Sequence, residues 1–413
     1  MRASKECEEL FKVIKSDKKD LGKNSKSKID WEPYKVNDYS NIKELIKSSD
    51  YFLGIREDYV NIYYMGMSMA KIETYYNRAC KYSLSYYYAK DIKGYKDKIK
   101  GQVVLNPTVF WDERNLELIK NRIEKHVFGK HDNKLRLEKV CQQWIINKNN
   151  SNADSKWYFV DMEYICKNSN NNEENHPFGR ADLIAITRKP NKNGKHDVAF
   201  VELKVGTDSY SGQRDSEEKM EVLLNESLYK INDIKLGSGL ASHMVDFMHF
   251  FANTFFVDQV KDEIIGILDW HKKFKLISND SDLGRLSSID KIEDKPSIQI
   301  VTYSSVPGVT IDKLADKCKK NYPNVSLKSM KESFYKYMYD SSMAFIDIVN
   351  NDDIRDIVDK KYDFEKFKDN NESQIKCQQC IDKTDKKDNK NKYDFIFRFI
   401  EVDDMGNCED CII

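Results

Sequence analysis

Two apolar runs near the middle of the chain predict its central strands: DLIAIT at residues 182–187 and DVAFVELKV at residues 197–205. Both are short and rich in β-branched or aromatic residues, which is typical of strands. Between them, RKPNKNGKH at residues 188–196 contains the turn signal Asn193-Gly194. The three segments therefore predict an antiparallel hairpin.

Charged residues interrupt these apolar runs. Glu202 and Lys204 are two residues apart, so in a strand they point to the same side, about 6.6 Å apart. If the loop closes symmetrically, Thr187 faces Asp197, and the same register places Asp182 opposite Glu202. The hairpin thus predicts that two carboxylates and an ammonium group gather on one face of a sheet.

This cluster has a chemical interpretation. Opposed carboxylates repel each other, and charges within an apolar strand are costly unless they are paired or bound to a metal. A divalent cation between Asp182 and Glu202, with Lys204 beside it, removes the conflict, and oxygen ligands favour Mg²⁺ or Mn²⁺. Such a site would activate water against a phosphodiester, with Lys204 orienting or deprotonating that water. Chance spacing in a chain with 33% charged residues is the alternative, and the apolar surroundings count against it.

The elements around the hairpin predict an α/β domain. Apolar residues recur at helical spacing in residues 116–127 and 135–146, and WYFVDMEYIC at residues 157–166 predicts a strand before the hairpin. Helical segments follow at residues 216–235 and after Gly239, then a strand at SIQIVTYSSV and a helical region from residue 311 to 349. Together they predict a mixed sheet layered between helices.

The segment HPFGRADLIAI followed by VAFVELKVG resembles the PD-(D/E)XK nuclease superfamily, the fold of many restriction and repair nucleases. The resemblance covers roughly residues 130–270 and implies a restriction-endonuclease-like αβββαβ core. It implies that Asp182 and Glu202 bind the metal and that Lys204 is the catalytic lysine. Ala181 stands where the superfamily pattern often has proline.

Further site residues are less strongly indicated. Many nucleases of this superfamily add a glutamate from the helix before the first strand, and Glu138 is the matching position, although an ordinary solvated glutamate is an equal alternative. Asp161 and Glu163 share a face of the first strand and are rival candidates. Candidates for substrate contact are Arg180, Gln213 and His243, the last weighed against a buried structural histidine.

Basic residues suggest where a phosphate backbone would bind. The loop with Arg188, Lys189, Lys192 and Lys195 lies about 17 Å along the hairpin from the acids, so a solvated loop is favoured there. A denser basic stretch on the flanking helices is favoured for backbone contacts. It comprises Lys120, Arg122, Lys125, Lys130, Lys134, Arg136 and Lys139.

The rest of the chain divides around this domain. We expect a variable segment at residues 1–40, a β-rich domain at 41–115, the nuclease-like domain at 116–349, and a charged linker with a tail at 350–413. In the β-rich domain, the runs YFLGI, YVNIYYM and SMAKIETYY predict an antiparallel meander after a short helix at residues 41–48. Its tyrosines can stack on bases or can be strand residues that pack a half-buried sheet, and the second interpretation is favoured. They are Tyr63, Tyr64, Tyr75, Tyr76, Tyr86, Tyr87 and Tyr88.

The tail contains two CxxC pairs, Cys377 with Cys380 and Cys408 with Cys411, separated by a strand-like run, YDFIFRFIEV. Four thiolates in this arrangement predict a structural Zn²⁺ site. A redox pair is the alternative, but neither CxxC has a thioredoxin-like βαβ context.

Composition limits the partners. The chain has 413 residues, with 68 Lys+Arg and 68 Asp+Glu, so nucleic-acid binding would depend on local charge clusters. No apolar run approaches the ~18 residues of a membrane span, no signal peptide is evident, and nine cysteines, five of them scattered, suit a reducing cytoplasm.

The leading hypothesis is a cytoplasmic, Mg²⁺-dependent DNA endonuclease in antiviral defence or repair. The alternatives are a catalytically inactive nucleic-acid-binding scaffold and an RNA-directed nuclease toxin. DNA is the expected partner, RNA the second choice, and a protein partner or homo-oligomer is compatible with the sequence.

Overall fold

The structure is a computed structural model that groups the chain into two compact units. Unit 1 comprises residues 1–151 and 262–287, and unit 2 comprises residues 152–261 and 288–413. Within the described residues, no helix is long and apolar enough to cross a membrane. The described residues are 38–45, 48, 50–56, 59–75, 79–93, 98–99, 101–128, 136–166, 179–205, 259–303, 372–376 and 394–400.

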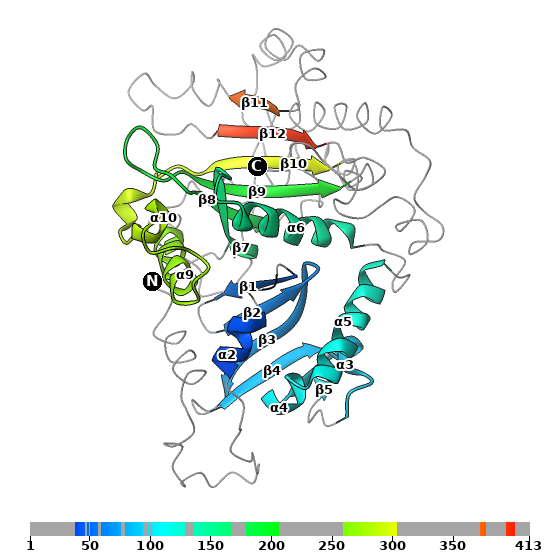
Figure 1. The fold of residues 1–413 in the computed structure, drawn as a ribbon. Coiled ribbons are helices and arrows are strands. Elements are labelled where there is room, and N and C mark those ends of the chain that lie inside the picture. Colours follow the sequence, from blue (N-terminus) through cyan, green and yellow to red (C-terminus); the bar gives the residue numbers. More distant parts are fainter. Residues whose placement is uncertain are drawn as a thin grey trace, which may run out of the picture. The chain divides into compact units, whose positions relative to one another are not determined.

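Unit 1 is built on a six-stranded antiparallel sheet in the order β1-β2-β3-β4-β6-β5 (Figure 1). Its first four strands pair in chain order, which confirms the predicted meander. The strands after β3 were not predicted. The strands are β1 (Tyr51–Ile55), β2 (Tyr59–Tyr64), β3 (Met67–Tyr75), β4 (Ala79–Ser85), β5 (Lys98–Ile99) and β6 (Gln102–Leu105).

Helices cover this sheet through regularly spaced apolar residues. In the longest of them, α5, Ile119, Ile123 and Val127 recur every four residues and are buried, which forms one apolar stripe. The predicted helices at residues 41–48, 116–127 and 135–146 are confirmed with shifted ends. The helices of unit 1 are α2 (Asp38–Leu45), α3 (Tyr86–Ala89), α4 (Pro107–Phe110), α5 (Glu113–Phe128), α6 (Leu137–Ser151), α9 (Lys261–Lys273, from its second residue) and α10 (Asp282–Arg285).

The tyrosines of unit 1 support the packing interpretation where their side chains are described. Tyr63, Tyr64 and Tyr88 are buried. The expectation that residues 86–88 belong to a strand is wrong, because Ser85 ends β4 and its hydroxyl accepts a hydrogen bond from the Tyr87 N–H, which caps α3.

The β2–β3 turn is pressed against the first turn of α6. Gly66 has φ of +72°, and a Cβ placed on it would lie 1.8 Å from the Lys139 carbonyl oxygen. The Gly66 N–H donates to Gln143 Oε1 at 2.7 Å, while Gln143 Nε2 donates to the Asp50 carbonyl. The Gln143 side chain therefore joins α6 both to the residue that precedes β1 and to the β2–β3 turn.

Unit 2 contains a mixed six-stranded sheet in the order β11-β12-β10-β9-β8-β7 (Figure 1). The strands β7, β8 and β9 are antiparallel, and β10 runs parallel to both β9 and β12. The predicted mixed sheet is confirmed for four of its strands: β7 (Trp157–Cys166), β8 (Gly179–Thr187), β9 (Val198–Val205) and β10 (Ser297–Tyr303). The sheet also contains β11 (Glu372–Lys376), which was not predicted, and β12 (Asp394–Ile400), which was expected as a strand-like run within the tail.

The hairpin register is the predicted one. Leu183 pairs with Val201, and the Thr187 N–H donates to the Asp197 carbonyl at 2.9 Å. Both faces of β9 are covered, since every residue from Val198 to Lys204 is buried. The charged residues of this strand therefore lie inside the protein.

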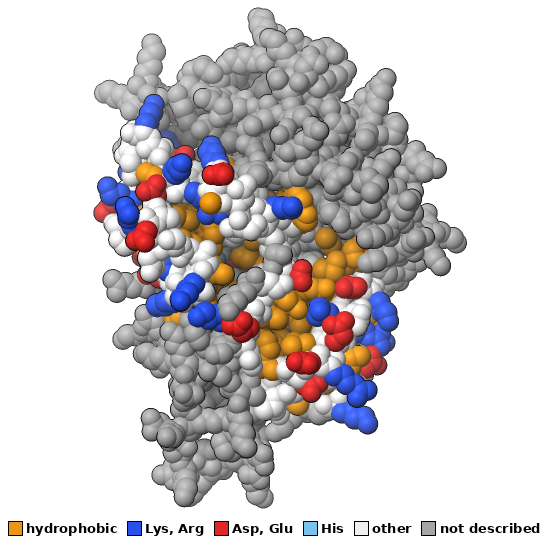
Figure 2. Space-filling model, viewed as in Figure 1, with side chains coloured by type: hydrophobic (Ala, Val, Ile, Leu, Met, Phe, Trp, Pro, Cys, Tyr) orange, Lys and Arg blue, Asp and Glu red, His pale blue; other side chains and the backbone are white. Residues whose placement is uncertain are grey.

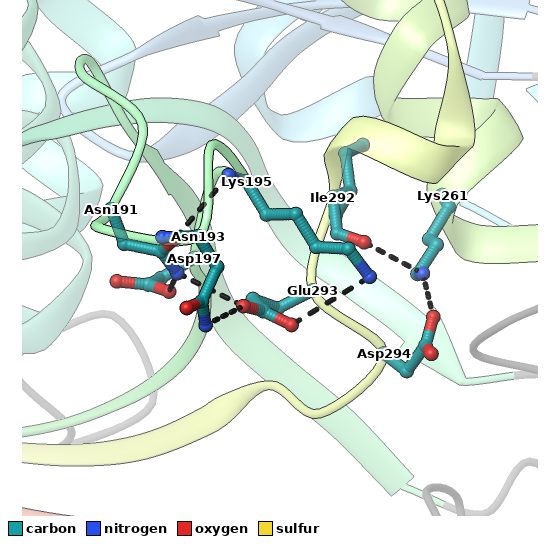
Figure 3. A network of polar contacts seen from close by, with 8 residues as sticks. All are labelled: Asn191, Asn193, Lys195, Asp197, Lys261, Ile292, Glu293 and Asp294. Atoms are coloured by element: carbon teal, nitrogen blue, oxygen red, sulfur yellow. Dashed lines mark hydrogen bonds and ion pairs between the residues drawn. The ribbon is translucent and has the colours of Figure 1, made fainter.

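A polar network holds the closed end of the hairpin (Figure 3). Asn191 Nδ2 donates to Asp197 Oδ1 at 2.8 Å and to Glu293 Oε1 at 3.0 Å, and Lys195 Nζ lies 3.9 Å from Glu293 Oε2. Lys189 and Lys192 are exposed, which agrees with a solvated loop.

The same network reaches the start of α9. Lys261 Nζ donates to the Ile292 carbonyl at 2.9 Å and to the Asp294 carboxylate. The hydrogen bond from Lys261 lowers the pKa of Asp294, even though partial burial opposes this. The segment around the short 3-10 helix η6 (Ile289–Lys291) is thus attached to Lys261 through Ile292 and Asp294, and to the hairpin loop through Glu293.

Candidate functional site

The ends of β8 and β9 bring the three predicted site residues together. Asp182, Glu202 and Lys204 are all buried. Lys204 Nζ lies 2.5 Å from Glu202 Oε1, with 6% and 3% of the two side chains exposed, and it also donates to the Leu203 carbonyl at 3.1 Å. A charged pair removed from water to this extent needs tight geometry to be tolerated.

Asp182 is fixed by the backbone of the neighbouring strand. Leu183 and Val201 form the last pair of the β8–β9 ladder, and continuing the register would join Ala181 to Leu203. Instead, the Leu203 N–H donates to Asp182 Oδ2 at 2.8 Å. The carboxylate thus replaces a ladder partner where the strands separate, next to Glu202.

A third carboxylate lies in the same row. Glu163 of β7 stands opposite Asp182, since the residues on either side of it pair with Leu183 and Ala181. The β8–β9 register puts Asp182 opposite Glu202 in turn. Three neighbouring strands therefore carry acidic residues at one level of the sheet, and the sequence indicated Glu163 only as a rival candidate.

The outer carboxylates of this row each have a basic partner. Lys204 pairs with Glu202, and Arg180 Nη1 lies 2.8 Å from Glu163 Oε2. Arg180 and Lys204 both lie two residues from an acid of the row on their own strands. The site thus consists of a row of acids followed by a row of cations.

Asp161, the other rival on β7, is also buried. It pairs with Ile184 after a β-bulge that follows Phe159, and its Oδ1 accepts a hydrogen bond from the Met162 N–H at 2.8 Å. Because Ile184 and Asp182 are two residues apart, Asp161 belongs to the face that carries the acids.

Other predicted residues belong to unit 1. Glu138 is in the first turn of α6 in unit 1, where burial first and then its charge raise the pKa of Cys141. Two members of the basic stretch have acidic partners in unit 1: Lys120 with Glu117 and Arg122 with Asp91.

Several predictions fall outside the described residues. They are the segment 1–37, the helices expected at 216–235, after Gly239 and at 311–349, the substrate contacts Gln213 and His243, and the zinc ligands Cys377, Cys380, Cys408 and Cys411.

The acidic pair has the chemistry that a hard divalent cation requires. Asp182 and Glu202 provide carboxylate oxygens from adjacent strands, which are ligands that Mg²⁺ and Mn²⁺ prefer. Across the described ranges, no group of three or more His, Cys, Asp or Glu residues is close enough to hold a metal ion. The carboxylate oxygens of Asp182 and Glu202 are suitable ligands for such a cation. In this conformation, however, Glu202 Oε1 accepts a hydrogen bond from Lys204 Nζ.

Comparison with known proteins finds no matching family model, no similar curated protein and no similar solved structure. A functional interpretation of this chain therefore depends on the residues of the site. The buried Asp182, Glu202 and Lys204 are its centre.

Proposed function

We propose that the protein is a metal-dependent nuclease with a restriction-endonuclease-like core, and that DNA is its substrate. The observation that carries this proposal is the buried group of Asp182, Glu202 and Lys204 where β8 and β9 separate. Three antiparallel strands followed by one parallel to the third support the proposed αβββαβ order.

The residues of the site have distinct roles in this proposal. Asp182 and Glu202 would hold a Mg²⁺ or Mn²⁺ ion, which when bound lowers the pKa of a water ligand and neutralises charge on the phosphodiester. The Leu203 N–H keeps the Asp182 carboxylate oriented. The Lys204 ammonium can turn from Glu202 to orient the attacking water or stabilise the developing charge.

Substrate binding must depend on a few residues near the site, since no large basic surface is seen on the described face. On the face shown in Figure 2, basic and acidic side chains are interspersed over the described surface, in keeping with 68 residues of each sign. A uniform positive field that attracts nucleic acid is therefore not expected, and contacts near the acids become decisive. Defence against foreign DNA or repair, in the cytoplasm, remains the proposed setting. The tail cysteines are proposed to bind Zn²⁺.

A catalytically inactive scaffold is the second candidate, and one observation favours it. Glu202 already has a counter-charge, since Lys204 lies 2.5 Å away, so the buried pair can also serve structure alone. A protein of this kind would bind nucleic acid without requiring a metal at Asp182. An RNA-directed nuclease toxin would share the site chemistry and differ in substrate.

The decisive experiment is a cleavage assay on the purified full chain. Plasmid DNA, linear DNA and RNA are each incubated with Mg²⁺, Mn²⁺ or EDTA. Wild type is compared with Asp182→Asn and Lys204→Met, which preserve side-chain volume. Lys71→Met is the matched control, because Lys71 also pairs with a glutamate two residues away on a strand.

We expect metal-dependent cleavage by wild type and Lys71→Met, with at least ~100-fold loss in the other two variants. The polymer that is cut identifies the substrate and separates the DNA and RNA alternatives. Equal cleavage by Asp182→Asn and wild type would refute the catalytic assignment. Binding without cleavage by wild type would support the scaffold.

A further inference from the structure

The ion pair between Arg180 and Glu163 contributes little to the stability of the fold, so stability does not explain why these two side chains meet. The two side chains meet at 2.8 Å, but 57% of the Arg180 side chain is exposed. Ion pairs open to water on one side contribute little to stability because solvent screens them. Arg180 would lose little if it pointed freely into solvent instead.

The backbone at Glu163 strengthens this point. Glu163 has φ of +55°, in the left-handed region that residues with a Cβ rarely adopt. It does so within β7, between residues that keep regular pairing with β8. Such conformations cost free energy and cluster at functional sites. A strained residue that forms a weakly stabilising pair points to a role for the pair itself.

Arg180 is placed where a polyanion bound at the acids would extend. It lies two residues from Asp182 on β8, so the two side chains leave the same face about 6.6 Å apart. Asp182 is 6% exposed and Arg180 is much more open. Moving from Asp182 to Arg180 therefore leads from the buried row of acids toward solvent.

The guanidinium group has the donors for this task. Glu163 Oε2 lies 2.8 Å from Nη1, and the planar group carries five N–H donors, enough to bind a carboxylate and a phosphate at the same time. A carboxylate on one side of the guanidinium fixes its plane, so less side-chain freedom is lost when a phosphate binds.

We propose that Arg180 binds the backbone phosphate next to the one held at the acids, and that Glu163 is a positioning residue that orients Arg180. This inference rests on the proposed phosphodiester function. It specifies a polynucleotide strand, with at least two consecutive phosphates, as the ligand. A mononucleotide would not reach both rows.

The test measures binding without metal, so that it does not depend on cleavage. A fluorescent oligonucleotide, single- or double-stranded, is titrated with the full chain in EDTA over a series of salt concentrations. The variants are Arg180→Met, Arg180→Lys, Glu163→Gln and the double variant. Lys71→Met and Glu73→Gln are matched controls from a part-exposed strand pair in unit 1.

Arg180→Met is expected to raise Kd about 10-fold and to reduce the slope of log Kd against log salt by about 1. Arg180→Lys leaves the slope of log Kd against log salt unchanged but raises Kd, because lysine keeps the charge and lacks the planar guanidinium group. Glu163→Gln raises Kd by about 3-fold, because a guanidinium group that is no longer held in place loses more side-chain freedom when a phosphate binds. In the Arg180→Met background, Glu163→Gln has no further effect.

Three results would overturn the inference: an unchanged salt slope in Arg180→Met, effects of the two substitutions that multiply in the double variant, or no oligonucleotide binding by wild type. Thermal unfolding of each variant distinguishes a lost contact from a lost fold. Failure of the proposed function looks different. In that case wild type binds with the Arg180-dependent slope and cuts nothing with Mg²⁺ or Mn²⁺.

Discussion

The two sheets each contain a lysine and a glutamate two residues apart on one strand, in opposite environments. In unit 1, Lys71 and Glu73 of β3 lie 2.9 Å apart with 36% and 22% of their side chains exposed. In unit 2, Glu202 and Lys204 of β9 lie 2.5 Å apart with 3% and 6% of their side chains exposed. The same residue spacing gives a solvated pair in one sheet and a buried pair in the other.

The difference shows that burial gives a strand ion pair its energetic importance. Glu73 also contacts Lys81, and although burial alone would raise its pKa, hydrogen bonds and charges from the two lysines hold its pKa below the ordinary value. Water also solvates the Glu73 carboxylate, because 22% of that side chain is exposed. Glu202 has little access to water, so Lys204 must provide most of its counter-charge in this conformation.

The largest expected effect comes from removing the cation of the buried pair. Lys204→Met should lower the free energy of unfolding by about 3–5 kcal/mol, since it leaves Glu202 charged and buried. The double variant Glu202→Gln/Lys204→Met should recover most of this loss. Urea unfolding in EDTA measures both changes. A loss below ~1 kcal/mol in the single variant would mean that water reaches Glu202.

A buried titratable group in unit 1 gives the next effect. His271 of α9 is 1% exposed, and burial lowers its pKa to about 4. The ordinary pKa is about 6.5, so between these values the unfolded chain binds a proton that the folded chain does not. Stability should therefore fall as pH drops from about 6.5 to 4, by about 3 kcal/mol. Urea unfolding of wild type and His271→Asn across this pH range isolates the contribution of His271 to the free energy of unfolding. If the free energies of the two proteins change in parallel with pH, the prediction is wrong.

The turn at Gly66 tests packing within unit 1 without any charge. Gly66→Ala should lower the free energy of unfolding by about 2–3 kcal/mol, because the new methyl group meets the Lys139 carbonyl at 1.8 Å. Gly101→Ala is the control, since Gly101 also has positive φ but nothing within 4 Å of an added Cβ. The control should lose only about 1 kcal/mol. Equal losses in thermal or urea unfolding would remove the packing explanation.

The smallest effect completes the comparison. Lys71→Met removes the cation of the solvated pair and should change the free energy of unfolding by less than about 1 kcal/mol. Raised salt should reduce this difference further, because exposed charges are screened. Urea unfolding at two salt concentrations checks both statements. A loss as large as that of Lys204→Met would show that exposure does not separate the two pairs.

Local patterns predicted much of the fold. The two short apolar runs and the turn signal within residues 182–205 predicted the hairpin and its register, and periodic apolar residues predicted α5 and α6. The prediction failed at Tyr86 to Tyr88, where aromatic residues suggested a strand and the cap at Ser85 makes a helix instead. The strands β4, β5 and β6 were also missed, and β5 and β6 have only 2 and 4 residues, too few to carry a pattern.

The candidate site was predicted only in part. Asp182, Glu202 and Lys204 stand out because charges interrupt apolar strands, so composition in a short window reveals them. The pairing of Glu163 with Arg180 has no such signal. It depends on the β7–β8 register, which crosses a long connection that no turn motif specifies.

By itself, the sequence determined which residues share a face, because the two-residue period of a strand and the turn in residues 188–196 are local properties. Only the tertiary structure decided which charged pair is buried, which acid stands opposite Asp182, and why residue 66 has to be glycine. These outcomes depend on what covers a strand and on contacts between segments far apart in the chain. Local propensity does not contain that information.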